Sequence, residues 1–487
     1  MAQPNFKSDI VIGLEIHFQP NLNTKLFCSC PAQLQNNKSN KQNKTHDNKE
    51  DTPNTRTCVV CLGMPGSKPV LNKKAVEHAL TLALALNSNI APELLFSRKS
   101  YFYPDLAKNY QISQFELPLG TGGSILLSSG KKVNLERLHL EEDPASLVHP
   151  NAIDNSAYSL IDYNRSGTCL IELVTKPEMT SPDEAREFMK KLRTILQYLK
   201  IFDEQTGVIK ADANVSIKES GYIRSEVKNI TGFKEIERAL EYEIERQKQA
   251  VKHNEPLIME TRAWDSIKGK TTRLRIKETE ADYGYIIDTD LVPTDITQGM
   301  INAVKKSLPE LPDQKVKKFV QQHKLSQLDA HVLAMERVLA ELFEKVAEKV
   351  NPILAAQWLR HELVRVANYN KLELSELRIE ELEIIELLSM VEKKEITDRT
   401  AQKILGLLAE KSFSPRKYVE ENNLKIISNT NELEKLCKKA IVESEKAVKD
   451  YKAGKDAALN SVVGKVMQYT KGTANPEKVK EMLKKMV

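Results

Sequence analysis

The chain has 487 residues, of which 41% are hydrophobic and 29% charged, and its formal net charge is +5. This length exceeds a single ordinary core and predicts about two to four domains. No apolar run reaches the roughly 20 residues that a membrane span needs, and residues 1–4 (MAQP) do not begin a hydrophobic signal sequence, so we predict a cytoplasmic protein with no membrane segment.

Residues 10–19 (IVIGLEIHFQ) alternate apolar side chains with others, which predicts a strand. Successive side chains of a strand point to opposite faces, so Glu15 and His17 share one face while isoleucines, Leu14 and Phe18 occupy the other. The first face could hold a metal or a phosphate. It could also be the solvated side of a half-buried strand, which is the more frequent situation for such a run taken alone.

Four of the six cysteines form a C-x-C pair and a C-x-x-C pair, namely Cys28, Cys30, Cys58 and Cys61. In a cytoplasmic chain two close pairs favour zinc over disulfides, because four thiolates satisfy a tetrahedral ion. Four protein ligands leave no open position, so a structural role is expected. The alternative is four reduced, unligated thiols, and the long polar spacer at residues 31–57 leaves that alternative open.

Strand-like runs separated by Gly and Pro turns continue to about Pro293, with two helices among them. Residues 73–86 have helical periodicity, and residues 183–198 follow Ser181 and Pro182, an N-cap and a proline at the first helical position. These elements predict an α+β domain.

Three of the strand-like runs carry acidic or amide side chains. Residues 137–143 (RLHLEED) place His139 and Glu141 on one face and Glu142 on the other, and residues 168–174 (TCLIELV) hold Glu172 among apolar neighbours. Residues 210–217 (KADANVSI) show a face of Lys210, Asp212, Asn214 and Ser216. A buried carboxylate requires a cation, a metal or a hydrogen-bond network.

Carboxylate oxygens are the ligands of hard divalent ions, and magnesium in phosphoryl transfer usually takes one or two of them. Glu15, Glu141, Glu142 and Glu172 could therefore hold one or two ions around ATP. His17 could orient a water or suit manganese, since imidazole is an unusual magnesium ligand. Each run by itself is explained by a salt-bridging strand face, but their occurrence together favours a site.

Common catalytic motifs are missing from the sequence. No complete G-x-x-x-x-G-K-[ST] loop occurs, and residues 268–272 and 120–123 predict hairpin turns instead of phosphate loops. We find no G-x-S-x-G and no amidase-type Ser and Lys array, and Cys169 is best explained as a buried structural thiol. The chain is therefore not expected to form an acyl-enzyme of its own.

The last third of the chain changes character. Residues 297–408 are rich in Leu, Glu, Lys and Ala at helical spacing and predict a helical bundle. Residues 401–487 contain 18 Lys and Arg against 11 Asp and Glu, which indicates either a nucleic-acid contact or a solvated helical surface. We predict three domains, at residues 1–294, 295–410 and 411–487.

These segments, taken together, resemble the B subunit of the bacterial aspartyl/glutamyl-tRNA amidotransferase. The blocks that carry the resemblance occur in one order along almost the whole chain: VIGLEIH at 11–17, CLGMPG at 61–66, YFYPD at 101–105, YQISQ at 110–114, HLEED at 139–143, LIE at 170–172, ADANVS at 211–216, VKN at 227–229, GKVM at 464–467 and KGTANP at 471–476.

The resemblance implies a mixed-sheet, cradle-shaped catalytic domain, a helical domain and a small helical tail like the YqeY family. It implies an ATP-dependent carbon–nitrogen ligase that phosphorylates the side-chain carboxylate of Glu or Asp misacylated onto tRNA(Gln) or tRNA(Asn). Ammonia would then displace phosphate, with glutamine as its source in a glutaminase A subunit and a small C subunit completing a heterotrimer. The missing nucleophile motifs agree with that division of labour.

The resemblance also implies roles for individual residues. It implies that magnesium binding and catalysis involve Glu15, His17, Glu141, Glu142 and Glu172, and that the four cysteines bind structural zinc. ATP or substrate contacts fall to Tyr103, Asp105, Gln114, Asp212, Asn214 and Lys228, and tRNA contacts to Gly464, Lys465 and Lys471.

The chain departs from the resembled family in three places. The spacer at residues 31–57 is longer and more polar, residues 106–108 (LAK) replace a proline-containing turn, and residues 282–288 (DYGYIID) lack an Arg and a Phe-Pro expected after Asp-Tyr. Three other interpretations remain. The first is the related archaeal E subunit, which carries an inserted domain for which this chain has no room after Pro293. The others are a non-catalytic tRNA-binding scaffold and a zinc-dependent nucleic-acid binder, which would leave the carboxylates without a role.

Overall fold

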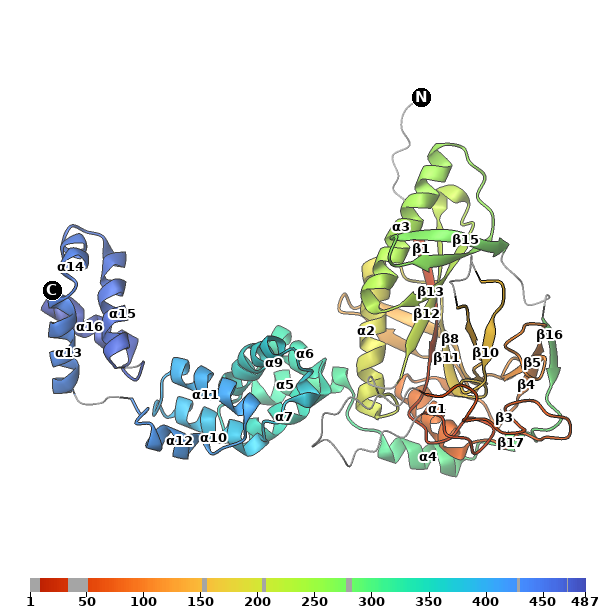
Figure 1. Cartoon of the computed structure of the whole chain (residues 1–487), viewed down its shortest axis with the longest axis horizontal. Helices are drawn as coiled ribbons and strands as arrows, with labels where there is room; N and C mark the ends of the chain where they lie inside the picture. The colour runs from red at the N-terminus through yellow and green to blue at the C-terminus, as the bar shows by residue number, and fades with distance from the viewer. Residues whose placement is uncertain are drawn as a thin grey trace. The chain divides into compact units, whose positions relative to one another are not determined.

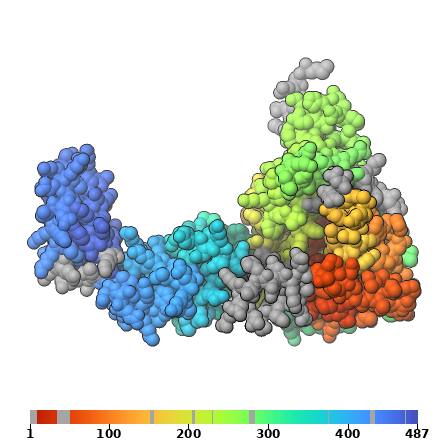
Figure 2. Space-filling model, in the orientation of Figure 1, coloured from red at the N-terminus to blue at the C-terminus, as the bar shows by residue number. Residues whose placement is uncertain are grey.

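The computed structural model describes residues 9–33, 51–150, 156–203, 207–276, 283–426, 430–470 and 472–487. The chain divides into two compact units, Met1–Pro309 and Glu310–Val487, and the fold is α+β as predicted (Figure 1). In the space-filling view, segments of the first unit that are far apart in sequence, coloured red through green, lie against one another (Figure 2). The boundaries of the three predicted domains stay predictions.

The first unit is built on a mixed ten-stranded sheet with the order β15-β14-β13-β12-β1-β11-β8-β6-β2, and β7 pairs with β8. All neighbours are antiparallel except β13 and β14. The strands are β1 (Ile10–Phe18), β2 (Asn89–Ile90), β6 (Gly120–Thr121), β7 (Ser124–Leu126), β8 (Lys132–Glu142), β11 (Cys169–Thr175), β12 (Ile209–Ile217), β13 (Ser225–Thr231), β14 (Glu260–Asp265) and β15 (Lys270–Ile276).

Strand β1 lies inside this sheet, between β12 and β11. Its apolar side chains from Ile12 to Phe18 are at most 1% exposed, which confirms the predicted alternation. Because the apolar face fixes the register, the polar face of β1 is held in line with the polar faces of β11, β12 and β8.

Helices cover the sheet. The predicted helices are α1 (Lys73–Ala85) and α2 (Pro182–Leu199), the latter begun by the Ser181 cap. Helix α3 (Phe233–Lys252) packs beside α2 and against β12, β13 and β15 (Figure 1). Helix α4 (Gln298–Ser307) packs on α1.

Short strands form three smaller sheets in the first unit. They are β3 (Glu93–Leu94) paired with β17 (Thr294–Asp295), β9 (Ser146–Val148) paired with β10 (Leu160–Asp162), and β5 (Tyr110–Ser113), β4 (Ser97–Ser100) and β16 (Gly284–Ile287) in a three-stranded sheet. Strand β16 carries most of the third segment that departs from the resembled family. Asp288 directly after it is 1% exposed and pairs with Arg98, which fastens the strand.

The turn before β7 gives the first testable prediction. Gly123 has φ +90°, and a Cβ there would lie 2.6 Å from the Leu86 carbonyl oxygen. Gly123→Ala should therefore lower the free energy of unfolding by about 2–5 kcal/mol, from left-handed strain and overpacking. Gly130→Ala is the matched control, because Gly130 has φ +85° with nothing within 4 Å, and should cost only about 1–2 kcal/mol. Urea unfolding measures both, and equal costs would contradict the prediction.

The second unit is helical. Its helices are α5 (Pro312–His323), α6 (Gln327–Ala334), α7 (Arg337–Ala347), α8 (Pro352–Gln357), α9 (Val364–Asn370), α10 (Glu381–Glu392), α11 (Asp398–Glu410), α12 (Pro415–Glu421), α13 (Thr430–Val442), α14 (Glu445–Lys452), α15 (Leu459–Tyr469) and α16 (Pro476–Met486), with a π-helical turn η3 (Trp358–Leu363) before α9. Among the described residues, no helix combines the length and the apolar character needed to cross a membrane.

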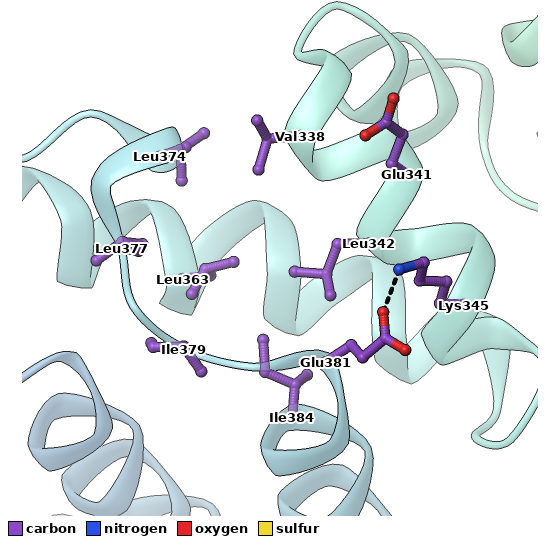
Figure 3. A pocket seen from close by; sticks show the side chains of 10 residues that line it. All are labelled: Val338, Glu341, Leu342, Lys345, Leu363, Leu374, Leu377, Ile379, Glu381 and Ile384. Carbon is purple, nitrogen blue, oxygen red and sulfur yellow. Dashed lines mark hydrogen bonds and ion pairs between the residues drawn. The ribbon is translucent and has the colours of Figure 1, made fainter. Parts of the chain in front are cut away.

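A cavity of about 220 Å³ lies in this unit against α7 and α10 (Figure 3). Its lining is mostly leucine, isoleucine and valine, and an ion pair between Lys345 and Glu381 lies at its side. The lining contains no cysteine, histidine or second acid–base pair, so this cavity offers no chemistry comparable to that of the first unit.

Helices α13 to α16 enclose a hydrophobic core of their own, with Leu433, Val466 and Leu483 each fully buried. Helix α12 instead packs on α10, where Ser414 Oγ bonds Glu386 and Arg416 pairs with Glu395. Residues from α13 onward therefore form a tail with its own core, and the Gly472 carbonyl of this tail accepts a hydrogen bond from Thr397 Oγ1 at 2.9 Å.

Candidate active site and metal centres

Acidic and imidazole side chains gather where β1, β11 and β8 run side by side. The register places His17 opposite Glu172, and Glu172 opposite His139. His17 Nε2 lies 3.2 Å from Glu172 Oε2, 3.3 Å from Glu141 Oε1 and 3.8 Å from Glu15 Oε1. Two overlapping groups have ligand atoms within 4.8 Å of one another: Glu15, His17 and Glu172, and His139, Glu141 and Glu172.

Burial and mutual charge shift the pKa values of this cluster. Burial raises the pKa of Glu15, and the charge of Glu172 raises it further. Desolvation opposes ionisation of Glu141, but hydrogen bonds from His139 and His17 outweigh it and lower its pKa to about 2. Desolvation also opposes the charged form of His17, yet hydrogen bonds to Glu141 and Glu172 raise its pKa well above the usual value. The cluster therefore stabilises positive charge.

This donor set fits a divalent cation. Glu141 and Glu172 are only 4% and 6% exposed, so their charges need compensation inside the protein. Carboxylate oxygens suit magnesium and manganese, and imidazole nitrogens suit manganese or zinc. His139 Nδ1 is buried and has no hydrogen-bond partner among the described residues. No contact at this atom therefore fixes the tautomer of the imidazole ring.

The cluster lies in the wall of a cavity of about 960 Å³. Besides the cluster, its lining includes the aromatic residues Tyr101, Phe102, Tyr103 and Tyr283, the cations Lys99, Arg165, Lys210 and Lys228, and the acids Asp105, Asp143 and Asp212. Phe102 and Tyr103 are 86% and 51% exposed, so their rings are available for stacking. The cavity thus combines a cation-binding wall, basic groups and aromatic faces.

Most predicted binding residues line this cavity. Tyr103, Asp105, Asp212 and Lys228 belong to it, and Lys228 Nζ donates to Asp212 Oδ2 at 2.6 Å. Asp105 Oδ1 is buried with no hydrogen-bond partner among the described residues. It is therefore placed to accept a hydrogen bond from a ligand.

Two other predicted binding residues lie outside the lining. Asn214 pairs with Gly13 of β1. Gln114 is 1% exposed. Its side-chain oxygen accepts a hydrogen bond from the Leu140 N–H and its side-chain nitrogen donates to the Leu95 carbonyl, so both ends of the amide already have backbone partners.

Glu142 points away from the cluster, as strand alternation predicts. Its carboxylate accepts from Lys108 Nζ at 2.5 and 2.7 Å and from the Ile112 N–H at 2.9 Å. It shares no metal-ligand group with Glu141 or Glu172 in the described part of the chain. The structure thus brings together four of the five predicted metal residues and ties the fifth into an ion pair.

Sequence reasoning did not assign three residues that the structure adds to the site. Strand alternation in the sequence placed His139 on the same face as Glu141. The sequence did not show that β11 is the neighbouring strand, whose Glu172 completes the ligand group. Lys210 lies opposite His17 in the register. Arg165 is in a turn, where no periodicity indicates the direction of a side chain.

The four predicted cysteines converge near the start of α1. The Sγ atoms of Cys30 and Cys58 lie 4.0 and 3.9 Å from that of Cys61, and all four ligand atoms lie within 4.8 Å. Sulfurs bound at about 2.3 Å to a tetrahedral ion are about 3.8 Å apart, so the geometry fits zinc. A hydrogen bond from Cys28 lowers the pKa of Cys61 to about 4, which favours a thiolate there.

The predicted tRNA-contacting residues lie in the tail. Gly464 and Lys465 are in α15, and Lys465 Nζ donates to the Glu443 carbonyl at 2.7 Å. Lys471 lies outside the described residues.

Comparison with known proteins agrees with this architecture. Residues 10–302 match the GatB/GatE catalytic domain, and residues 341–487 match the GatB domain. The chain is 40% identical to the aspartyl/glutamyl-tRNA(Asn/Gln) amidotransferase B subunit of Carboxydothermus hydrogenoformans, over 98% of both chains. Proteins of the same description from Thermotoga maritima and Sulfurisphaera tokodaii are 41% and 42% identical, over 98% of this chain and 98% and 99% of theirs. The chain belongs to the family of aspartyl/glutamyl-tRNA(Asn/Gln) amidotransferase B subunits.

Proposed function

We propose that this chain carries out the ATP-dependent amidation of Glu or Asp misacylated onto tRNA(Gln) or tRNA(Asn). The observation that carries the proposal is the convergence of half-buried Glu15 and His17 with buried Glu141 and Glu172 in the wall of a cavity of about 960 Å³. Family membership and the names of the relatives support the same reaction.

The proposed reaction has two steps. A side-chain carboxylate oxygen of the aminoacyl group attacks the γ-phosphorus of ATP, which forms an acyl phosphate and releases ADP. Ammonia then attacks the acyl carbon, and phosphate leaves as the amide forms. A free carboxylate is a poor acyl donor, so activation must come first.

Glu15, His17, Glu141 and Glu172, with His139, are the residues that would hold a divalent ion, which we propose to be magnesium. When bound, the ion would offset negative charge on the transferred phosphoryl group. Lys228, held by Asp212, and Lys210 supply further positive charge from the same cavity. Tyr103 and Asp105 would contact the nucleotide or the aminoacyl end, and such contacts by Gln114 and Asn214 stay predictions from the resemblance.

The source of ammonia is proposed to be a glutaminase A subunit joined through a small C subunit, in the cytoplasm. The catalytic motifs absent from the sequence support an external source, because nothing identified in this chain would hydrolyse glutamine. The tail, with its surplus of lysines, is proposed to bind tRNA.

The test is amide formation on Glu-tRNA(Gln) and Asp-tRNA(Asn) by the chain with its A and C partners. Ammonium chloride replaces glutamine, and ATP is present or omitted. ATP-dependent product is expected, and the productive tRNA identifies the substrate. No product on either tRNA from folded, partnered protein would favour the scaffold function instead.

Zinc in the four-cysteine site, which we call the cysteine cluster (Cys28, Cys30, Cys58 and Cys61), gives a separate prediction. The purified chain should contain about one zinc per molecule, and Cys58→Ser should lose most of it, because a three-thiolate site binds the ion less tightly. Plasma mass spectrometry measures the metal content. Cys169→Ser is the control, since Cys169 is a buried thiol outside the cysteine cluster. Equal zinc in the parent and in Cys58→Ser would contradict the assignment.

A further inference from the structure

The cysteine cluster lies against a turn that reaches the catalytic cavity. This turn, residues 163–168, connects β10 to β11 and is closed by hydrogen bonds from Ser166 N to Tyr163 O and from Thr168 N to Arg165 O. It joins the end of β8 through Gly167 N, which donates to the Asp143 carbonyl at 2.9 Å. The turn therefore connects the cysteine cluster with the strands that carry Glu141 and Glu172.

The chain segments that carry the cysteines hold this turn from one side. The contacts are Lys25 Nζ to Tyr163 O at 3.2 Å, Tyr163 N to Asn54 Oδ1 at 2.7 Å, Arg56 N to Asn164 Oδ1 at 2.7 Å, Asn164 Nδ2 to Thr52 O at 2.8 Å, Ser166 Oγ to Cys61 O at 2.9 Å and Leu26 N to Gly167 O at 3.0 Å. Each residue of the turn from 163 to 167 is fixed in this way except Arg165.

Arg165 instead lines the cavity. Its Nε and Nη2 donate to the carbonyls of Pro144 and Ala145 at 2.9 and 2.7 Å, and Nε lies 3.4 Å from Asp143 Oδ2. The side chain is 33% exposed and lines the cavity that contains the metal-ligand cluster. Nη1 has no hydrogen-bond partner among the described residues, so a guanidinium that is held at Nε and Nη2 keeps donor hydrogens for a ligand in the cavity.

The packing between the cysteine cluster and the turn is close. Lys25 and Asn164 are 0% and 2% exposed, and a Cβ added at Gly167 would lie 3.5 Å from Cys61 Cβ and 3.9 Å from Glu142 Oε2. The same added Cβ would lie 3.7 Å from Lys25 Cδ, so Lys25 and Cys61 both pack against Gly167. A shift of the cysteine cluster would therefore be passed to the backbone that carries Arg165.

We propose that Arg165 binds a phosphoryl oxygen of the substrates in the catalytic cavity, and that the metal-loaded cysteine cluster positions it by fixing the turn at residues 163–168. A guanidinium is suited to this task, because it is always charged and its planar donors match phosphate oxygens. The inference rests on the proposed function, since it takes ATP or an acyl phosphate as the ligand. The cysteine cluster then stabilises the geometry of the active site as well as the local fold.

The first arm of the test measures binding of β,γ-methylene ATP with magnesium to the full chain by calorimetry. Arg165→Gln should bind the analogue about 10- to 100-fold more weakly, the range expected for loss of a hydrogen bond to a charged group. Zinc content should be unchanged. Arg186→Gln is the matched control, because Arg186 pairs with Glu237 on the α2 side of the sheet and should bind the analogue like the parent.

The second arm changes the link between the cysteine cluster and the turn, and keeps the cysteines and Arg165. Asn164→Ala, or the milder Ser166→Ala, should weaken analogue binding with full zinc content. The double variant Asn164→Ala/Arg165→Gln should bind no more weakly than Arg165→Gln alone, because both changes act through one contact. A merely structural role for Asn164 would give additive losses.

The outcomes separate this inference from the proposed function. In the ammonium-dependent assay, Arg165→Gln should raise the KM for ATP more than it lowers kcat. The inference would be overturned if Arg165→Gln bound the analogue within twofold of the parent, or if the losses in the double variant were additive. The proposed function would still stand in either case if the parent forms amide. A parent that binds the analogue but forms no amide would overturn the proposed function alone.

Discussion

Glu172→Gln should lower the kcat/KM of ATP-dependent amide formation by at least about 100-fold. Glu172 belongs to both groups of candidate metal ligands and lies between His17 and His139 in the sheet. A neutral amide in its place removes one negative charge from the cation site. A metal ion stabilises a transferred phosphoryl group by several kcal/mol, and about 1.4 kcal/mol corresponds to a tenfold change in rate. Manganese affinity, measured by calorimetry, should fall in parallel.

The controls for this variant come from the same strands. Glu136→Gln changes an exposed carboxylate of β8 and should leave activity and manganese affinity unchanged. Glu142→Gln should retain manganese affinity but lower stability, because it leaves Lys108 without its buried partner. Full activity of Glu172→Gln would remove the proposed site. Loss of manganese affinity in Glu142→Gln would instead restore Glu142 to the ligand set that the sequence predicted.

Removal of residues 427–487 should weaken binding of tRNA by about tenfold or more at roughly 0.1 M salt. The removed segment contains 13 lysines and 8 acidic residues, and counterion release makes such contacts strongly dependent on salt. The slope of log K against log salt should become shallower by about one for each phosphate that the truncated chain no longer binds. Filter binding or fluorescence anisotropy with the cognate tRNA at several salt concentrations measures both quantities.

This truncation is chosen from the packing. It keeps α12 and its N-cap Ser414, with the contacts of Ser414 to Glu386 and of Arg416 to Glu395. It removes the separate core of α13 to α16 and, with it, the hydrogen bond from Thr397 Oγ1 to the Gly472 carbonyl. The partner proteins should therefore remain attached, and the unfolding of the first unit should be unchanged. An unchanged tRNA affinity and salt slope would show that the tail does not bind tRNA.

The local patterns of the sequence predicted several elements correctly. The period of two in residues 10–19 and 210–217 gave strands β1 and β12 and the sides on which Glu15 and Asp212 lie. The Ser181 cap gave the start of α2. These features depend on backbone geometry within a few residues, which is why the sequence alone determines them. The spacing of the cysteines likewise indicated four ligands that the structure places together.

Strand pairing decided the remainder. Strands β8 and β11 each place a carboxylate on one polar face, but only their antiparallel register brings Glu141 and Glu172 to the same His17 and adds His139. Alternation turned Glu142 to the other face, and the tertiary structure supplied its partner Lys108. Arg165 joins the cavity through a turn that distant segments hold, and such contacts leave no periodic trace in the sequence. The sequence by itself determined the α+β class, the family and most of the chemical groups. Their convergence was decided by the tertiary structure, because long-range pairing and burial, and not local propensity, fix which side chains meet.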